Sequence, residues 1–311
     1  MTRRVAAIDC GTNSIRLLIA DVDVRQERLT DVAREMRIVR LGEGVDRTGR
    51  LSEAALDRTI GALREYADLI EALSPAAVRM VATSATRDAA NSQEFVDRVK
   101  DVLGVAPEVI SGDEEASLSF TGATRELASA LGCPPPYLVT DIGGGSTEFV
   151  LGEPRGVSGV RSVDIGCVRM TERHLHSDPP SAAEVAAATA DIDSALELVA
   201  ASVPADEAKT LVGLAGSVAT VAGIALGLQS YDAARIHHSR IAAAQVHEVT
   251  GLLLRQTRAQ RATIGVMHPG RVDVIGAGAL VLDRIITRFG FAEVLVSEHD
   301  ILDGMAWSLV P

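Results

Sequence analysis

The chain has 311 residues, of which 47% are hydrophobic and 23% are charged, and its formal net charge is −12. This composition is typical of a folded globular protein with room for two domains, and it excludes an intrinsically disordered chain. The acidic balance and an aromatic content of 3% argue against nonspecific nucleic-acid binding, which needs basic stripes and stacking side chains.

The sequence also indicates no membrane partner and no metal or disulfide framework built on cysteine. No apolar stretch reaches the roughly 18 uncharged residues that a membrane-spanning helix needs. The first strand pattern begins within four residues of Met1, which leaves no room for the apolar region of a signal peptide. Cys10, Cys133 and Cys167 show no C-x-x-C spacing. We therefore expect a cytoplasmic protein.

The first half of the sequence predicts the element order βββαβαβα. Apolar runs predict the strands, and Ser52 is a candidate N-cap for a helix whose apolar stripe runs from Leu56 to Ile70. The predicted strands are 4–8, 15–22, 32–40, 78–82 and 108–110, and the other predicted helices are 92–103 and 114–131.

The second half repeats this pattern. Ser181 and Glu184 have the spacing of a capping box at the start of a helix. The predicted strands are 137–140, 147–151, 157–165, 211–214 and 293–296, and the later predicted helices are 217–226, 242–256, 272–289 and 301–309.

Two copies of this order resemble the duplicated ribonuclease-H-like α/β architecture that actin, sugar kinases and Hsp70 share. Gly132 and the proline run 134–136 predict the domain boundary, which gives domains 1–131 and 132–311. We expect a ligand site in a cleft between the domains, where such sites are common. The last helix, 300–311, is expected to pack back on the first domain.

Each predicted domain opens on a hairpin whose turn suits a phosphate group. The turns read Asp9-Cys10-Gly11-Thr12-Asn13-Ser14 and Asp141-Ile142-Gly143-Gly144-Gly145-Ser146-Thr147-Glu148. Glycine lets a ligand approach the backbone closely, and successive N–H groups can form an anion nest. The predicted phosphate-binding residues are Gly11, Thr12, Asn13, Ser14, Gly143, Gly144, Gly145, Ser146 and Thr147. The aspartates, Asp9 and Asp141, are predicted to hold Mg²⁺ directly or through water, as that ion uses few carboxylates.

Other candidates depend on single side chains. Arg87 ends a turn after a predicted strand, where a guanidinium can clamp phosphate oxygens. Arg16 lies two residues past the first turn, and strand alternation leaves its direction open. Glu114 and Glu115 are helix neighbours about 100° apart, so only one is expected to face the site. The residues alone do not choose between them.

Four motifs in this order resemble the exopolyphosphatase / guanosine pentaphosphate phosphatase family. They are the two turns, Ala82-Thr83-Ser84-Ala85-Thr86-Arg87 and Ile110-Ser111-Gly112-Asp113-Glu114-Glu115-Ala116, with weaker support from 213–217 and 296–300. Together they span nearly the whole chain. The resemblance implies hydrolysis of a terminal phosphoanhydride with Mg²⁺, or with Mn²⁺ as an alternative, and a homodimer.

The resemblance also implies roles for particular residues. Glu115 matches the general base that activates the attacking water, and Glu148 matches a catalytic metal ligand or water-positioning residue. Gly216 and Ser217 lie where related folds contact adenosine, so they are candidate contacts for a nucleoside or for the polyphosphate chain. Longer family members continue into a helical C-terminal region, whereas this sequence stops at Pro311. It therefore resembles the short, two-domain form and is expected to act on shorter chains.

These expectations leave three functions to compare. The first is a Mg²⁺-dependent exopolyphosphatase that releases orthophosphate from short inorganic polyphosphate. The second is a guanosine pentaphosphate 5′-phosphohydrolase of the stringent response. The third is a non-catalytic sensor of alarmone or polyphosphate, which the presence of Glu115 and Glu148 disfavours because neither acid helps to bind an anion. A sugar or acid kinase is less favoured, because the region of Glu115 resembles a water-activating site.

Overall fold

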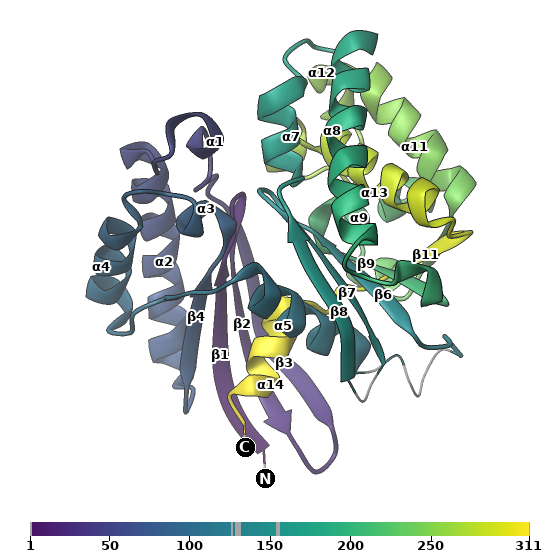
Figure 1. Cartoon of the computed structure of the whole chain (residues 1–311). Coiled ribbons are helices and arrows are strands. Elements are labelled where there is room, and N and C mark those ends of the chain that lie inside the picture. The colour runs from purple at the N-terminus through teal and green to yellow at the C-terminus, as the bar shows by residue number, and fades with distance from the viewer. Residues whose placement is uncertain (1, 126, 128–131, 154–155, 311) are drawn as a thin grey trace. The chain divides into compact units, whose positions relative to one another are not determined.

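The computed structural model of this chain describes residues 2–125, 127, 132–153 and 156–310. The chain divides into two compact units, shown in Figure 1. Unit 1 comprises Met1–Gly122 and Asp300–Pro311, and unit 2 comprises Ala123–His299. The predicted domain boundary lies between residues 131 and 132, and residue 131 is outside the described residues. The last residues of the predicted helix 114–131 are outside them too.

Unit 1 is built on a mixed sheet with the strand order β3-β2-β1-β4-β5. Its strands are β1 (Thr2–Cys10), β2 (Ser14–Asp23), β3 (Arg28–Ile38), β4 (Val78–Ala82) and β5 (Glu108–Val109). The first three strands are antiparallel neighbours, and β4 runs parallel to β1 and to β5. Since β1 is central, its residues from Val5 onward are buried whichever face they point to, which explains its unbroken apolar run.

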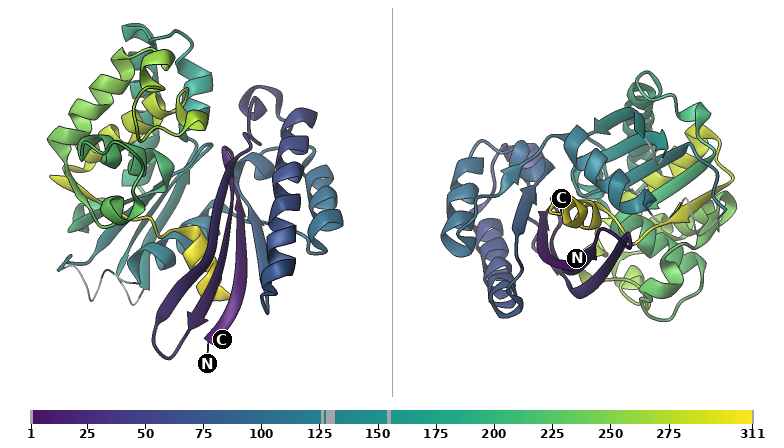
Figure 2. Two further views of the ribbon diagram at one scale, coloured as in Figure 1. Left: turned by 180° about the vertical axis from the view of Figure 1, so that it is seen from behind. Right: turned by 90° about the horizontal axis from the view of Figure 1, so that it is seen from below.

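Helices cover both faces of this sheet, as the two views in Figure 2 show. On one face lie α2 (Glu53–Leu73) and α4 (Ser92–Leu103), which pack on Ile8, Leu17 and their neighbours. On the other face α14 (Ile301–Ser308) packs on Val5 and Leu18, near α5 (Gly112–Thr124). Short helices α1 (Val45–Thr48) and α3 (Ser84–Arg87) complete the unit. The Ser52 hydroxyl caps α2 as predicted, accepting from Ala55 N–H.

Unit 2 repeats this topology, with the strand order β10-β11-β9-β6-β7-β8. Its strands are β6 (Tyr137–Ile142), β7 (Thr147–Glu153), β8 (Gly156–Val163), β9 (Thr210–Leu214), β10 (Arg240–Ala242) and β11 (Glu293–Val296). The antiparallel β6, β7 and β8 correspond to β1, β2 and β3, and β9 and β11 correspond to the parallel β4 and β5. This shared order confirms the predicted duplicated ribonuclease-H-like fold, with β10 added at one edge.

The helices of unit 2 enclose its core against this sheet. They are α7 (Cys167–His174), α8 (Ala182–Ala200), α9 (Ala215–Ala225), α10 (Ala233–Ile236), α11 (Ala243–Arg255), α12 (Arg258–Arg261) and α13 (Ile275–Phe289), with the 3₁₀ turns η1 (Ala205–Glu207) and η2 (Pro269–Arg271). The predicted capping box of Ser181 and Glu184 is present at the start of α8. Within the described residues, no helix is both long and apolar enough to cross a membrane.

Several elements differ from the sequence prediction, each for a local reason. The strand predicted at 32–40 occupies 28–38, because residues 28–31, which are mostly polar and exposed, continue the hairpin with β2. The helix predicted at 272–289 begins at Ile275, after the turn η2. α7 and β10 were not predicted from sequence, because they are too short for a clear apolar period.

Candidate active site

The turn between β1 and β2 is oriented by the segment that follows β3. Gly42 N–H donates to Thr12 O at 2.9 Å, and Val39 N–H donates to Asn13 O at 3.0 Å. In a planar trans peptide the N–H points opposite to the C=O, so the N–H groups of Asn13 and Ser14 point away from this segment. The Asn13 Oδ1 atom is buried and accepts no hydrogen bond within the described part of the chain. The backbone N–H groups of Asn13 and Ser14 are thus two donors on the same side of the first turn.

The other predicted residues of this turn serve to hold its shape. Gly11 N–H donates to Ser14 O at 3.0 Å, which closes the turn. The Thr12 and Ser84 hydroxyls are hydrogen-bonded at 2.9 Å, which ties the turn to α3. A Cβ atom on Gly42 would overlap the Thr12 side chain, so the contact needs a glycine there. Gly42 was not among the residues predicted from sequence, and Ser84 was predicted only as part of the motif 82–87.

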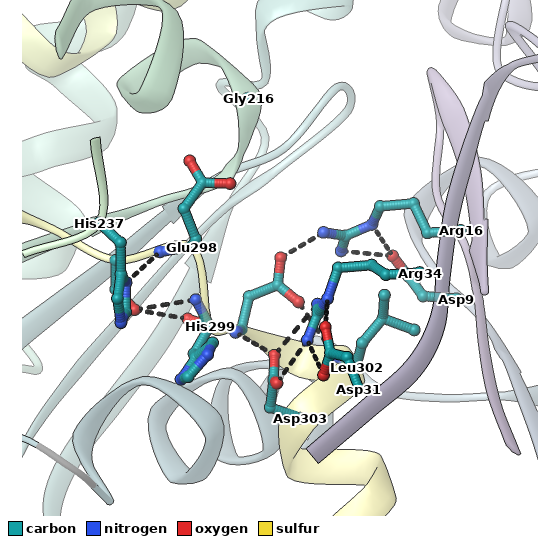
Figure 3. A network of polar contacts seen from close by, with 12 residues as sticks. Asp9, Arg16, Asp31, Arg34, Gly216, His237, Glu298, His299, Leu302 and Asp303 are labelled. Carbon is teal, nitrogen blue, oxygen red and sulfur yellow. Dashed lines mark hydrogen bonds and ion pairs between the residues drawn. The ribbon is translucent and has the colours of Figure 1, made fainter. Parts of the chain in front are cut away.

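Asp9, predicted as a metal ligand, is engaged with Arg16. Arg16 donates to Asp9 Oδ2 through Nε at 3.1 Å and Nη2 at 2.6 Å, and its Nη1 donates to Asp300. Figure 3 shows this pair and the neighbouring pair of Arg34 with Asp303, whose nearest atoms lie 2.7 Å apart. The direction of Arg16, left open by strand alternation, is thus toward Asp9.

The electrostatics of the two aspartates differ. Burial raises the pKa of Asp9, while the charge of Arg16 opposes that rise. Burial also opposes ionisation of Asp300, but Arg16 and Arg34 together hold the pKa of Asp300 below its ordinary value. An Asp9 oxygen that already accepts two bonds from a guanidinium is poorly placed to bind a metal directly.

The structure distinguishes Glu115 from Glu114. The Glu115 carboxylate lies 3.5 Å from Arg87, and 13% of its side chain is exposed. The Glu114 side chain is 46% exposed and pairs with Arg79 at 2.9 Å. Arg87 Nη1 also donates to Ile110 O at 2.9 Å, which fixes the guanidinium beside Glu115. The predicted base and the predicted phosphate clamp are therefore neighbours, and Glu114 belongs to a surface ion pair.

The glycine turn of unit 2 is held from one side by the start of α7. The turn carbonyls of Gly143, Gly144 and Gly145 accept, in that order, from Cys167 N–H at 2.9 Å, Val168 N–H at 2.8 Å and Arg169 Nε at 2.7 Å. Because each N–H lies opposite to the preceding C=O, the amides of Gly144, Gly145 and Ser146 point away from α7. The turn thus offers three successive N–H donors on its other side.

Two residues around this turn are more constrained than the sequence suggests. A Cβ atom on Gly166 would overlap the Gly144 carbonyl, so only glycine allows α7 to approach so closely. The Thr147 hydroxyl donates to Ile165 O at 3.1 Å, and the residue is fully buried. This hydroxyl proton is therefore used inside the protein, and phosphate binding by Thr147 stays a prediction.

Asp141 and Glu148 face each other directly across β6 and β7. Both are buried, with relative exposures of 8% and 2%. The Ser162 hydroxyl donates to Glu148 Oε1 at 2.7 Å. Like charges at directly opposed positions destabilise a sheet, so this arrangement favours a bound cation.

The donor set fits Mg²⁺ in one particular way. Mg²⁺ is usually bound by one or two carboxylates together with phosphate oxygens and water, rather than by a cage of protein ligands. Over the residues that the structure describes, no group of three or more His, Cys, Asp or Glu side chains could hold a metal ion. The Asp141–Glu148 pair therefore suits an ion that arrives with a phosphate.

Gly216 and Ser217 lie in a tightly packed turn at the start of α9. Arg271 Nη1 donates to Gly216 O at 3.1 Å, and a Cβ atom on Gly216 would overlap that guanidinium. Ser217 is buried and packs against Gly278, where an added Cβ atom would overlap the Ser217 side chain. The preceding Ala215 has a φ of 67°, an uncommon conformation for a residue with a Cβ. The absence of a side chain at Gly216 therefore allows the Arg271 guanidinium to lie against the backbone of this turn. Arg271 was not among the residues predicted from sequence.

The residues missed from sequence act over long separations. Arg169 and Gly145 are 24 positions apart, and Arg271 and Gly216 are 55 positions apart. No local pattern couples residues at such distances. The only sequence signal is the placement of Gly166 directly before the short amphipathic stretch of α7.

The chain is similar to known proteins over nearly its whole length. A model of the Ppx/GppA phosphatase family matches residues 18–311. The chain is 53% identical to exopolyphosphatase 2 of Mycobacterium tuberculosis over 317 residues, which cover 98% of each chain. It is 30% identical to a guanosine-5′-triphosphate,3′-diphosphate pyrophosphatase of Aeromonas salmonicida, over 98% of this chain and 59% of that relative. A solved exopolyphosphatase-like protein matches with a TM-score of 0.93 at 43% identity, over 98% of each chain.

Proposed function

Because this chain belongs to the Ppx/GppA phosphatase family, we propose that it hydrolyses the terminal phosphoanhydride of short inorganic polyphosphate and releases orthophosphate. The observation that carries this proposal is the glycine turn of unit 2. Its three amides point to one side, and the turn is flanked by two carboxylates at directly opposed positions, Asp141 before it and Glu148 after it. This arrangement suits a phosphate together with a divalent cation.

In the proposed reaction, the protein mainly positions and neutralises charge, as is usual for phosphoryl transfer. The amides of Gly144, Gly145 and Ser146 donate to the oxygens of the phosphate under attack, where negative charge develops. Asp141 and Glu148 would hold Mg²⁺ or Mn²⁺, which when bound would neutralise phosphate charge. Asp9, already paired with Arg16, is proposed to form no direct metal bond.

Glu115 is proposed as the general base that removes a proton from the attacking water. The Glu115 carboxylate lies 3.5 Å from the Arg87 guanidinium. The same guanidinium is proposed to bind phosphate oxygens. Glu115 is largely buried, and the adjacent Glu114 is engaged with Arg79.

A second candidate is the 5′-phosphohydrolase reaction on guanosine pentaphosphate. The turn at Gly216, closely approached by the planar guanidinium of Arg271, favours this candidate, because such a plane can stack on a base. The Aeromonas relative is named for a substrate of this kind. The two reactions would use the same phosphate site.

A substrate panel separates these functions. Phosphate release is measured with tripolyphosphate, longer polyphosphate and guanosine pentaphosphate, each with and without Mg²⁺. The proposal expects Mg²⁺-dependent release from tripolyphosphate and short chains. Turnover of guanosine pentaphosphate that is faster by orders of magnitude would replace it with the second candidate. Tight binding without turnover of any substrate would leave only a sensor.

We also propose that the protein works as a homodimer, the commonest assembly among soluble oligomers. Light scattering on the purified protein measures this directly. A mass of twice 32.7 kDa is expected. A mass of one chain at assay concentration would contradict the proposal.

A further inference from the structure

The first N–H groups of α7 donate to the backbone of the glycine turn and not to a ligand. The free N–H groups at a helix N-terminus commonly bind an anion directly. Here the amides of Cys167 and Val168 donate to the carbonyls of Gly143 and Gly144 instead. The N-terminus of this helix therefore orients the glycine turn, and the turn's own amides are left for the ligand.

Arg169 adds the last part of this arrangement. Its backbone N–H donates to Gly144 O at 3.1 Å, and its side-chain Nε donates to Gly145 O at 2.7 Å. Gly166 N–H donates to the same Gly145 oxygen at 3.1 Å. The Arg169 side chain is 12% exposed, and its Nη2 lies 3.8 Å from the exposed Asp164. Arg169 thus contributes to the orientation of two successive peptides.

Such orientation matters because a run of glycines has a soft backbone. Without a Cβ, glycine has a wide range of backbone conformations, so a peptide bonded to a glycine of the run turns over more easily than one between two residues with a Cβ. If the peptide after Gly145 turned over, its carbonyl oxygen would replace the Ser146 N–H on the ligand side. A carbonyl dipole would then repel the phosphate that the amide attracts.

We propose that Arg169 is a positioning residue for the phosphate site, acting through the Gly145 carbonyl and not as a phosphate ligand. This inference rests on the proposed function, since it assumes that the glycine turn binds the phosphate under attack. Its effect is strongest where charge develops on the phosphate oxygens. Loss of the contact therefore lowers kcat more than it raises KM.

Three substitutions separate a positioning role from a ligand role. Arg169→Gln removes the charge but places its amide nitrogen at the same bond separation from Cα as Nε of arginine. Arg169→Lys keeps the charge and has a carbon at that position. Arg169→Met lacks both the charge and the donor.

The positioning role predicts that Arg169→Gln retains kcat within about threefold, whereas Arg169→Lys and Arg169→Met lose roughly 10- to 100-fold. The same three substitutions at Arg173, which lies on α7 and pairs with Asp191 at 3.5 Å, serve as matched controls and should leave kcat unchanged. Thermal melting of each variant confirms that it is folded.

Two outcomes overturn the inference. If Arg169→Lys retains activity and Arg169→Gln does not, the charge acts on the phosphate and Arg169 is a ligand. If all three variants match the wild type, Arg169 has no role in the site. A wild-type protein that hydrolyses none of the substrates contradicts the proposed function instead. The inference is then read from tripolyphosphate binding by calorimetry, which should weaken for the Lys and Met variants and not for the Gln variant.

Discussion

Asp141 and Glu148 occupy directly opposed positions on β6 and β7, so two acidic residues face each other where these strands meet the glycine turn. At the corresponding position of the first hairpin, Asp9 is opposed by Arg16. The two hairpins therefore have the same strand pairing but different charges at this position: an acid opposite a base in the first, and two opposed acids in the second. The first is neutralised by an ion pair inside the protein, and the second favours a cation.

Glu148→Gln should weaken the binding of Mg²⁺ by the enzyme. Removing one of the two opposed charges lowers the attraction for Mg²⁺, and the Mg²⁺ concentration for half-maximal phosphate release should rise roughly 10- to 100-fold. The melting temperature in EDTA should rise, because the repulsion between opposed acids is relieved. An unchanged Mg²⁺ titration would remove Glu148 from the metal site. Glu153→Gln, at the exposed end of β7, is the matched control.

Arg16→Met should destabilise unit 1 strongly. It leaves the buried Asp9 and Asp300 without the guanidinium that joins them, and loss of one partner of a buried ion pair costs about 3–5 kcal/mol. Adding Asp300→Asn should recover part of this loss, since one of the two stranded charges is removed. Urea unfolding of both variants measures the difference. A double variant no more stable than Arg16→Met would contradict the coupling.

The stability of unit 1 should depend on pH through Asp300. Its pKa in the folded protein lies below the ordinary value of about 3.9, so in acid the unfolded chain binds more protons at this site. The stabilisation is therefore fully present above that value and is lost as the pH falls through the lower, folded pKa. Asp300→Asn should flatten the urea-unfolding free energy between about pH 5 and pH 2 relative to the wild type. An unaltered pH profile would count against the ion pairs with Arg16 and Arg34.

Glu115→Gln should abolish turnover, while Glu114→Gln should leave it within about twofold. A general base contributes roughly 10²- to 10⁴-fold to a rate, and Glu115 is the acid held beside Arg87. Glu114 is exposed and paired with Arg79, so its loss should cost little. Phosphate release and tripolyphosphate binding are measured for both. Equal activity of the two variants would show that neither is the base.

Gly166→Ala should damage the phosphate site without touching a ligand. The added methyl group would overlap the Gly144 carbonyl, so the turn or α7 must shift, at a cost of about 1–3 kcal/mol in stability. A loss of kcat is expected with it. Gly156→Ala is the control, because a Cβ there meets nothing within 4 Å. Similar melting temperatures and rates for the two variants would show that α7 does not constrain the turn.

Elements with local signals were predictable from the sequence. The Ser52 cap and the capping box of Ser181 and Glu184 each depend on residues within one helical turn, and both are present. The two hairpin turns were also visible, because their glycines and aspartates are contiguous. By contrast, α7 has eight residues and no extended period, so its sequence does not distinguish it from a loop.

The order of strands, the two turns and the acids that flank them were determined by the sequence itself, because propensity, capping and turn chemistry act between near neighbours. Only the tertiary structure decided which way each peptide and side chain points. In it, Arg16 forms an ion pair with Asp9 and Glu115 lies beside Arg87. The first N–H groups of α7 donate to the carbonyls of the glycine turn. These orientations depend on partners far apart in the chain, and burial makes each partner obligatory, since an unpaired polar group inside a protein is costly.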